Sequence, residues 1–432
     1  MLVVVAGSVY YFSYYSGSDK SVDNNSSAKA IEKDVYVHFV MDAYDKISEN
    51  YWMKVGDYKA HNAMELPELL RLSLKKASNS DQVSEAHDRD GALQMITAAL
   101  DKATSTEQKK QLSIQTVLVL TYNLLPVGRN NLLSAQQEVA LRREVSNIDT
   151  GKDLYKDLGV QKGADTKQID TAFKEKAATL SQATSTQAKA ELQKITYAKK
   201  VLTNESTKAL YDEVKIEPTG FSHIFGKTLY LNIKKISPTT LQEFVRAVDE
   251  ASTTKSLNSL IIDFRGNIGG DLAFANALPG LFIGDRQYAY DLFSKEDYRP
   301  QRTYLKKYKD LERFKDVVIL VDNRTQSTAE LTAAILKRLN IARVVGTATA
   351  GWGTIENTYP LDVSVDPAQK YSLFLVNNIT LGDDNQPIEG RGVIPNVDIS
   401  KADWKSELAK YFDSPAFISV IQARLAEKPL LY

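Results

Sequence analysis

Two stretches in the second half of the chain decide its fold: SLIIDFRGNIGG at residues 259–270 and DVVILVDNRTQSTAELTAAILKRLN at residues 316–340. Each opens with a short apolar run without polar alternation, which is typical of strands buried on both faces of a sheet. The second stretch continues into a helical pattern that begins at Ser327. Further strand-like runs lie before and after these stretches, at residues 227–236, 343–349, 354–362 and 371–381. Strands separated by helices of this length predict an α/β domain with a mainly parallel sheet and right-handed crossovers.

A glycine-rich loop, residues 265–270, follows the first of these strands directly. Glycines after a strand let the backbone turn sharply and aim its N–H groups inward, so the loop is a candidate anion-binding nest or oxyanion hole. The spacing does not fit a GxGxxG dinucleotide loop. A plain tight turn is the structural alternative.

Ser327 lies between the second strand and its helix, in the sequence NRTQSTAE. A serine there places its hydroxyl at a helix N-terminus, where unpaired N–H groups and the helix dipole stabilise negative charge. Serine is also a preferred N-cap, and Glu330 three residues later completes a capping box. The loop therefore fits a nucleophile or an ordinary helix cap.

Together with ARVVGTATAGWGTIE at 342–356 and PIEGRGVIPNVDI at 387–399, these stretches resemble the tail-specific (C-terminal processing) protease family in order and spacing. The resemblance spans about 180 residues, from Phe221 to Ser400. It implies a crotonase-like or ClpP-like α/β protease core that hydrolyses peptide bonds of extended or unfolded polypeptides. It also implies that Ser327 is the nucleophile, and that Gly269 or Gly270, with the Thr328 N–H, forms the oxyanion hole.

One departure from the family concerns the general base. The lysine-type members have Gly-Lys-Gly in the third motif, whereas this chain has Gly351-Trp352-Gly353. A serine hydroxyl needs a neighbour that takes its proton, and an indole N–H cannot accept one. The Ser–Lys dyad is therefore absent.

Two interpretations of this departure stay open. The tricorn-like branch of the family pairs its serine with a histidine and a glutamate, and His223 and Glu389 are the candidates here. Glu330 and Glu356 are candidates for supporting hydrogen bonds. Alternatively, the domain has lost catalysis and holds peptides as an inactive scaffold.

The regions before the core are helical in pattern. Residues 31–150 predict an all-helical N-terminal domain, and residues 151–216 predict a smaller helical module. In the second, LYKDLGV, ADTKQIDTAFKEKA and ITYAKKVLTNESTKALYD resemble the J-domain of DnaJ-type co-chaperones. The His-Pro-Asp tripeptide of that family is missing, and Ser181, Gln182 and Ala183 stand in its place. We therefore expect a packing or substrate-presenting module and no chaperone partner. The resemblance implies that residues 217–400 form the protease core, and the pattern of residues 401–432 predicts two C-terminal helices.

Composition argues against several classes of partner and binding site. Lys+Arg and Asp+Glu number 54 each, and this balance argues against nucleic acid as the main partner. The chain has no cysteine, and its four histidines are far apart, so we expect no metal site or other cofactor. Residues 1–15 are mostly apolar and precede a polar linker at 16–30, which favours a membrane anchor. We therefore expect a membrane-anchored, extracytoplasmic protein of the bacterial cell envelope that acts on polypeptide substrates.

Overall fold

The computed structural model describes residues 34–53, 65–149, 151–182, 185–254, 256–295 and 297–427. The expected membrane anchor and linker at 1–30 lie outside these residues. Within the described ranges, no helix combines the length and the apolar character needed to cross a membrane. The chain divides into two compact units, Met1–Gln136 with Glu356–Asn377, and Gln137–Ile355 with Asn378–Tyr432.

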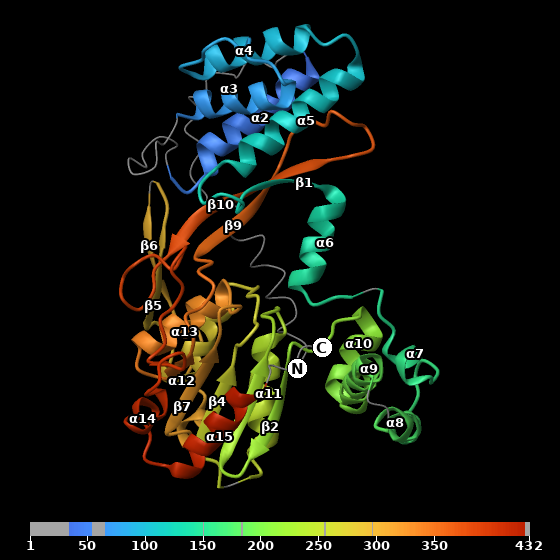
Figure 1. Cartoon of the computed structure of the whole chain (residues 1–432), viewed down its shortest axis with the longest axis vertical. Helices are drawn as coiled ribbons and strands as arrows, with labels where there is room; N and C mark the ends of the chain where they lie inside the picture. Colours follow the sequence, from blue (N-terminus) through green and yellow to red (C-terminus); the bar gives the residue numbers. More distant parts are fainter. Residues whose placement is uncertain are drawn as a thin grey trace. The chain divides into compact units, whose positions relative to one another are not determined.

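The first unit is a helical bundle with a small β component (Figure 1). Its helices are α2 (Val35–Asn50), α3 (Leu66–Ser78), α4 (Arg89–Asp101) and α5 (Thr106–Tyr122). Asp34, Asp88 and Ser105 cap three of these helices through side-chain hydrogen bonds, and Pro67 lies in the first turn of α3. The expectation of an all-helical region is wrong, because β1 (Asn131–Ser134) pairs with the start of β10 (Tyr371–Thr380). A partner strand some 240 residues away cannot be inferred from a local pattern.

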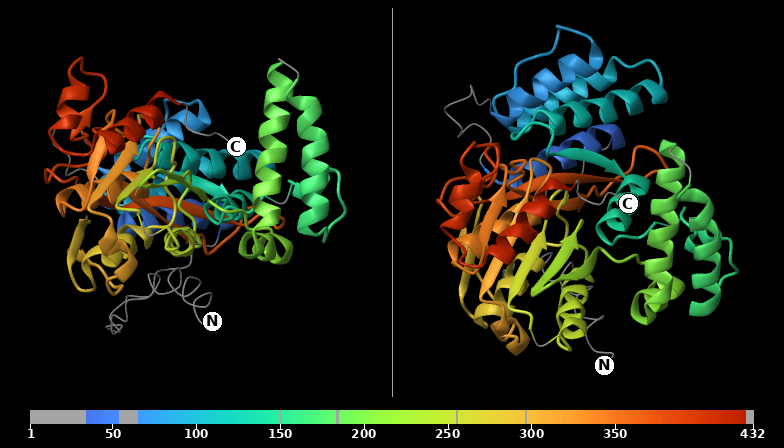
Figure 2. Two further views of the ribbon diagram at one scale, coloured as in Figure 1. Left: turned by 90° about the horizontal axis from the view of Figure 1, so that it is seen from below. Right: turned by 60° about the horizontal axis from the view of Figure 1, so that its bottom comes forward.

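The second unit begins with a helical module. Its helices are α6 (Ala135–Val145), α7 (Leu154–Leu158), α8 (Thr166–Leu180), α9 (Thr186–Thr203) and α10 (Glu205–Val214). Asp165 and Gln168 form a reciprocal capping box at the start of α8. Helices α8 and α9 lie side by side, as both views of Figure 2 show, and bury Ile169, Ile195 and Val201 between the helices of the module. The likeness of this module to a J-domain stays a prediction.

A six-stranded sheet forms the centre of the second unit. Its strand order is β11 (Val397–Asp398), β8 (Arg343–Gly346), β7 (Asp316–Val321), β4 (Ser259–Asp263), β3 (Thr228–Ile233) and β2 (Gly220–Phe225). Every neighbouring pair is parallel except β2 and β3, which are antiparallel. The mainly parallel sheet confirms the predicted class. The edge strand β2 was not expected, and His223 lies on it instead of preceding the first strand.

Helices cover both faces of this sheet. Alternate residues such as Leu231, Ile262 and Ile319 pack beneath α11 (Thr240–Ala251), α12 (Phe274–Ile283) and α13 (Thr328–Arg338). The intervening residues, including Ile261 and Val318, pack against α14 (Trp404–Ala409) and α15 (Pro415–Ala426). These last two helices agree with the prediction for the C-terminal segment. Apolar residues on both faces explain why the strands show no polar alternation.

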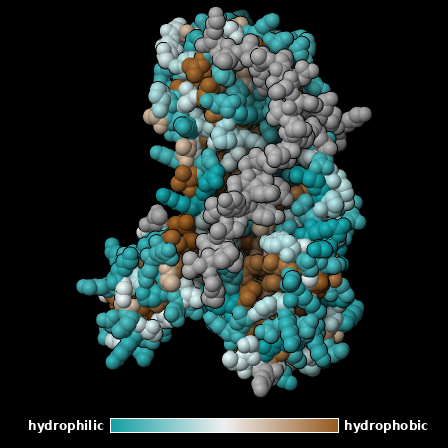
Figure 3. All heavy atoms as spheres, turned by 180° about the vertical axis from the view of Figure 1, so that it is seen from behind, coloured by the Kyte–Doolittle hydropathy of each residue, from teal (hydrophilic) through white to brown (hydrophobic). Residues whose placement is uncertain are grey.

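The remaining elements border the core. They are β5 (Tyr288–Phe293), β6 (Tyr298–Arg302), the short 3₁₀ helix η2 (Lys309–Arg313) and β9 (Thr354–Pro360). β5 pairs with β6 and with Ile379 and Thr380 at the end of β10. On the face drawn in Figure 3, hydrophilic side chains predominate and apolar ones occur in smaller groups.

Candidate active site

The predicted loops meet at the carboxyl edge of the sheet. Strands β4 and β7 are parallel neighbours, so the loops that leave them start side by side. Gly266 donates its N–H to Asp322 Oδ1 at 2.8 Å, and Gln326 donates its N–H to the Asn267 carbonyl at 2.8 Å. The glycine loop and the Ser327 loop are therefore bonded to each other along their length.

Ser327 has an unusual backbone conformation. Its φ of 54° and ψ of −126° lie in a region that side-chain-bearing residues rarely occupy, at a cost of about 1–3 kcal/mol. The residue is the N-cap of α13 and is half-buried, and it forms a reciprocal capping box with Glu330. The strained turn thus presents a serine hydroxyl at a helix N-terminus, as in the strand-to-helix turns that carry nucleophilic serines.

Gly269 lies against this serine. A Cβ added to it would be 2.6 Å from Ser327 Cβ and 3.0 Å from Thr328 N, and its φ is +83°. The close approach of the two loops at this point therefore requires glycine.

We predict that Gly269→Ala separates the loops and lowers both stability and the reactivity of Ser327. The clash is with backbone and Cβ atoms, so we expect a loss of about 2–4 kcal/mol in the free energy of unfolding, measured by urea denaturation. Gly128→Ala is the matched control, because Gly128 also has a positive φ, +81°, but has no atom within 4 Å of an added Cβ. Equal losses in the two variants would show that the contact with Ser327 has no effect.

The structure separates the two glycines proposed for the oxyanion hole. Gly269 donates its N–H to Asn267 Oδ1 at 2.8 Å, so this group is already engaged. The N–H groups of Gly270 and Thr328 have no hydrogen-bond acceptor among the residues that the structure describes. Thr328 Oγ1 also donates to the Gly270 carbonyl at 3.0 Å, which holds the two residues together. Gly270 and Thr328 are thus the pair available to an oxyanion.

Asn267 is a site residue that the sequence reasoning missed. Its side chain is fully buried, donates to the Ile233 carbonyl at 2.9 Å, and accepts from Gly269. The amide thereby fixes the glycine loop to the end of β3. An asparagine between two glycines in such a loop was the available signal, because a fixed loop conformation needs a local hydrogen-bonding side chain.

Glu330 organises the site through four hydrogen bonds that its carboxylate accepts. Its Oε2 accepts from the N–H groups of Ser327 at 2.8 Å and Trp352 at 2.7 Å. Its Oε1 accepts from Thr349 Oγ1 at 2.5 Å and from the Gly351 N–H at 2.7 Å. The carboxyl group is fully buried, and this burial raises its pKa above the ordinary value while the hydrogen bonds oppose the rise. Glu330 therefore ties the Ser327 loop to the Gly-Trp-Gly loop.

These contacts bear on the missing base. Four donors occupy the lone-pair positions of the Glu330 carboxylate, so it positions the loops and is not available to take the serine proton. Trp352 and Ser327 donate to the same oxygen, which places residue 352 beside the serine. The backbone of residue 352, where the lysine-type members carry lysine and this chain carries a half-buried tryptophan, is therefore close to the backbone of Ser327.

The predicted His223 base does not reach Ser327. His223 lies on β2, three strands from β7, which is roughly 14 Å across the sheet. Its Nε2 is 3.2 Å from Lys200 Nζ, and burial, with the charges of Lys200 and Arg424, lowers the pKa of the imidazole. Glu389 lies at the Gly-Trp-Gly loop, where one of its carboxylate oxygens accepts from the Gly353 N–H at 2.8 Å. The proposed His–Glu pair is thus corrected.

We predict that His223→Ala leaves the rate of Ser327 labelling by a fluorophosphonate within about twofold of wild type. A general base typically contributes on the order of a hundredfold or more, so its removal would be plain in the same assay. A hundredfold loss of labelling rate, with an unchanged circular dichroism spectrum, would show that the His223 imidazole does act as the general base.

The candidate Glu356, on β9, is assigned to the first compact unit, as are the histidines His38 and His87. His61 lies outside the described residues. In the described part of the chain, no group of three or more His, Cys, Asp or Glu side chains is arranged to hold a metal ion.

Comparison with known proteins agrees with this geometry. The model of peptidase family S41 matches residues 227–399. The carboxy-terminal processing protease CtpA of Bacillus subtilis is 28% identical over 185 residues, which cover 43% of this chain and 36% of that protein. A probable CtpA-like serine protease of Staphylococcus epidermidis is 28% identical over 184 residues, covering 42% of this chain and 35% of that protein. The chain thus spans about a third of the length of these relatives.

Among solved structures, a photosystem II D1 C-terminal processing protease aligns with a TM-score of 0.49 and 12% identity, covering 84% of this chain and 92% of that one.

Proposed function

We propose that the peptidase family S41 domain at residues 227–399, which is a serine-type peptidase domain, cleaves extended polypeptides through an acyl-enzyme on Ser327. The observation that carries this proposal is the contact between the glycine loop and Ser327. It leaves the N–H groups of Gly270 and Thr328 available beside a strained serine.

In the proposed reaction, Ser327 Oγ attacks the carbonyl carbon of the scissile peptide bond. The carbonyl oxygen becomes an oxyanion that accepts from the Gly270 and Thr328 N–H groups. Each such donor is worth about a hundredfold to a thousandfold in rate. The dipole of α13 acts in the same sense, because its N-terminus faces the developing charge. The proton that the Ser327 hydroxyl loses ends on the leaving amine nitrogen as its bond to the carbonyl carbon breaks, and the acyl ester on Ser327 remains. Water then hydrolyses this ester, which releases the carboxylic acid and restores the hydroxyl.

A second candidate function is peptide holding without cleavage. The observation that favours it is Trp352, because the family position for the proton acceptor carries a group that cannot accept a proton. The same site would then bind a polypeptide, and Ser327 would react slowly or not at all.

Trp352→Lys separates the two candidates. The backbone of residue 352 is close to that of Ser327, so the flexible side chain of a lysine at this position can place its amine near the hydroxyl. If the natural chain lacks a base, we expect casein cleavage and fluorophosphonate labelling to rise on the order of a hundredfold. If another group already acts as base, the rate stays the same or falls. Trp352→Met is the matched control, with a flexible side chain that takes no proton.

A further inference from the structure

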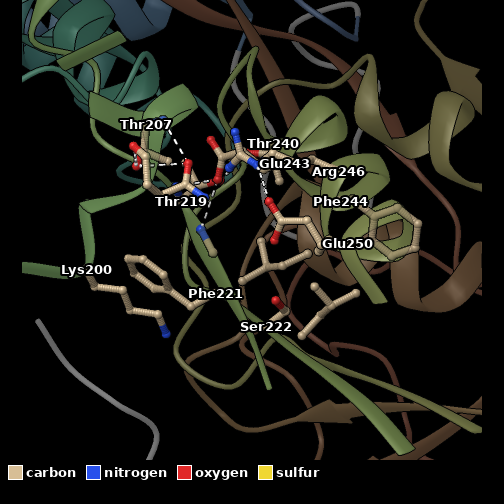
Figure 4. A pocket seen from close by; sticks show the side chains of 15 residues that line it. Lys200, Thr207, Thr219, Phe221, Ser222, Thr240, Glu243, Phe244, Arg246 and Glu250 are labelled. Atoms are coloured by element: carbon tan, nitrogen blue, oxygen red, sulfur yellow. Dashed lines mark hydrogen bonds and ion pairs between the residues drawn. The ribbon is translucent and has the colours of Figure 1, made fainter. Parts of the chain in front are cut away.

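A pocket lies between the helical module and the core. It has a volume of about 210 Å³ and is lined by α9, α10, β2, β3 and α11. Figure 4 shows Lys200 and Phe221 on one side of it, with Phe244, Arg246 and Glu250 on the other. The apolar side chains of Leu231 and Ile233 also line the pocket. The pocket is therefore amphipathic and distinct from the Ser327 site, from which β2 is three strands away.

The β2 strand runs along this pocket as an open sheet edge. It pairs with β3 alone, and in the described residues no other segment forms a backbone-to-backbone hydrogen bond with residues 220–225. Ile224 is 44% exposed. Such an edge presents backbone donors and acceptors in the arrangement that an extended peptide needs to add as another strand.

The charges at the pocket favour an anionic partner. Lys200 Nζ lies 4.1 Å from the centre of the Phe221 ring and 3.2 Å from His223 Nε2, and no carboxylate within the described ranges forms an ion pair with it. Burial lowers the pKa of Lys200 to about 8. Arg424, which is not among the residues that line the pocket, stacks on Phe225 at 4.3 Å and is paired with Glu427 at 2.6 Å.

The acidic residues of the pocket already have partners. Glu243 accepts from the N–H groups of Thr219 and Gly220, at 2.7 and 3.2 Å. Glu250 lies 3.8 Å from Arg246. The charged group of the pocket that lacks an ion-pair partner among the described residues is therefore Lys200 on α9, which lies beside the edge strand β2.

We propose that this pocket binds an extended polypeptide segment, which adds as a strand to β2 and places an acidic side chain against Lys200. Backbone hydrogen bonds to the edge give affinity for extended chain, and the ion pair selects the acidic residue. Apolar side chains of the same segment pack against Phe221 and Phe244. Binding does not depend on catalysis at Ser327, so it applies equally to an active peptidase and to a peptide-holding scaffold.

The absence of cysteine permits a direct test. Ser222 lines the pocket, and Ser222→Cys would carry the sole thiol of the chain. This variant is made in a Ser327→Ala background and incubated with peptides of Thr and Val that are acetylated at the N-terminus and amidated at the C-terminus. Each peptide carries one activated disulfide, which the introduced thiol can attack to form a mixed disulfide with the peptide. One series has glutamate at successive positions around the disulfide, and the other has glutamine. Intact mass measures the yield of captured peptide.

We expect the best glutamate peptide to be captured at least about tenfold more than its glutamine twin. Lys200→Gln should remove this preference, whereas Lys199→Gln should retain it, because Lys199 is paired with Asp170 at 3.0 Å. Ser406→Cys, with an exposed thiol on α14, should show no preference. Equal capture of the two series at residue 222 overturns the proposal.

A further arm identifies the source of the carboxylate. A glutamine peptide with a free C-terminus that is captured as well as the glutamate peptide would overturn the assignment to an acidic side chain. Because all arms lack Ser327, a negative result leaves the proposed peptidase activity untouched. Loss of fluorophosphonate labelling, conversely, leaves the peptide pocket untouched.

Discussion

Replacing Ser327 by alanine is expected to abolish fluorophosphonate labelling and to lower cleavage of an unfolded substrate by at least about a thousandfold. Alanine keeps the Cβ that contacts Gly269 and removes only the hydroxyl. The N–H groups of Gly270 and Thr328 stay in place, so binding of polypeptide should be preserved. Fluorescein release from labelled casein measures cleavage, and mass spectrometry of the labelled peptide locates the probe.

The backbone strain at Ser327 supplies a control for this experiment. Alanine at φ 54° and ψ −126° is as strained as serine, whereas glycine adopts these angles freely. Ser327→Gly should therefore be more stable than Ser327→Ala by about 1 kcal/mol, while both are inactive. This result would show that the backbone conformation that presents the Ser327 hydroxyl lowers the stability of the fold. Cleavage that persists in both variants would remove Ser327 from the mechanism.

The part of the site that the sequence predicted depends on strand direction. The strands at 259–263 and 316–321 were recognisable from unbroken apolar runs, and parallel strands bring their carboxyl ends to one edge. Loops at 265–270 and 322–327 therefore had to lie together. The start of a helix after Ser327 followed from its capping pattern, which the structure confirms.

The part that could not be predicted depends on contacts between distant residues. β2 was missed because its sequence, GFSHIF, is short and half exposed, and its place comes from pairing with β3. Without that strand, nothing in the sequence kept His223 from the serine. The choice of Gly270 over Gly269 rests on one hydrogen bond, which the Gly269 N–H donates to the Asn267 side chain.

Glu330 illustrates the same limit. The sequence identified it as a capping residue, and it does accept from the Ser327 N–H. Its other donors, Thr349, Gly351 and Trp352, are about twenty residues away, so the second half of its role is tertiary. A buried carboxylate bonded to two loops is a stronger structural determinant than a surface cap.

Glu330→Gln is expected to lower the free energy of unfolding by roughly 2–5 kcal/mol. Glutamine has nearly the same shape, but its amide nitrogen faces N–H donors where the carboxylate offered an acceptor. At least two of the four donors then lose their partner in a buried site, at about 1–3 kcal/mol each. Urea denaturation measures the loss. The matched control is Glu312→Gln, because Glu312 is exposed and paired only with Lys307 at 3.1 Å, and should change by less than about 1 kcal/mol.

The Glu330 variant should also lose Ser327 labelling while the Glu312 variant keeps it, because the Ser327 and Trp352 loops share the lost acceptor. A pH series adds an independent readout. Burial raises the pKa of Glu330 in the folded chain, so the folded state binds this proton more tightly than the unfolded state. The stabilisation that comes from protonation of Glu330 is therefore full below the ordinary pKa of 4.5 and is lost as pH rises through the higher folded-state pKa. Glu330→Gln should remove this slope. An unchanged pH dependence, with a stability loss below about 1 kcal/mol, would mean that the carboxylate does not hold the two loops together.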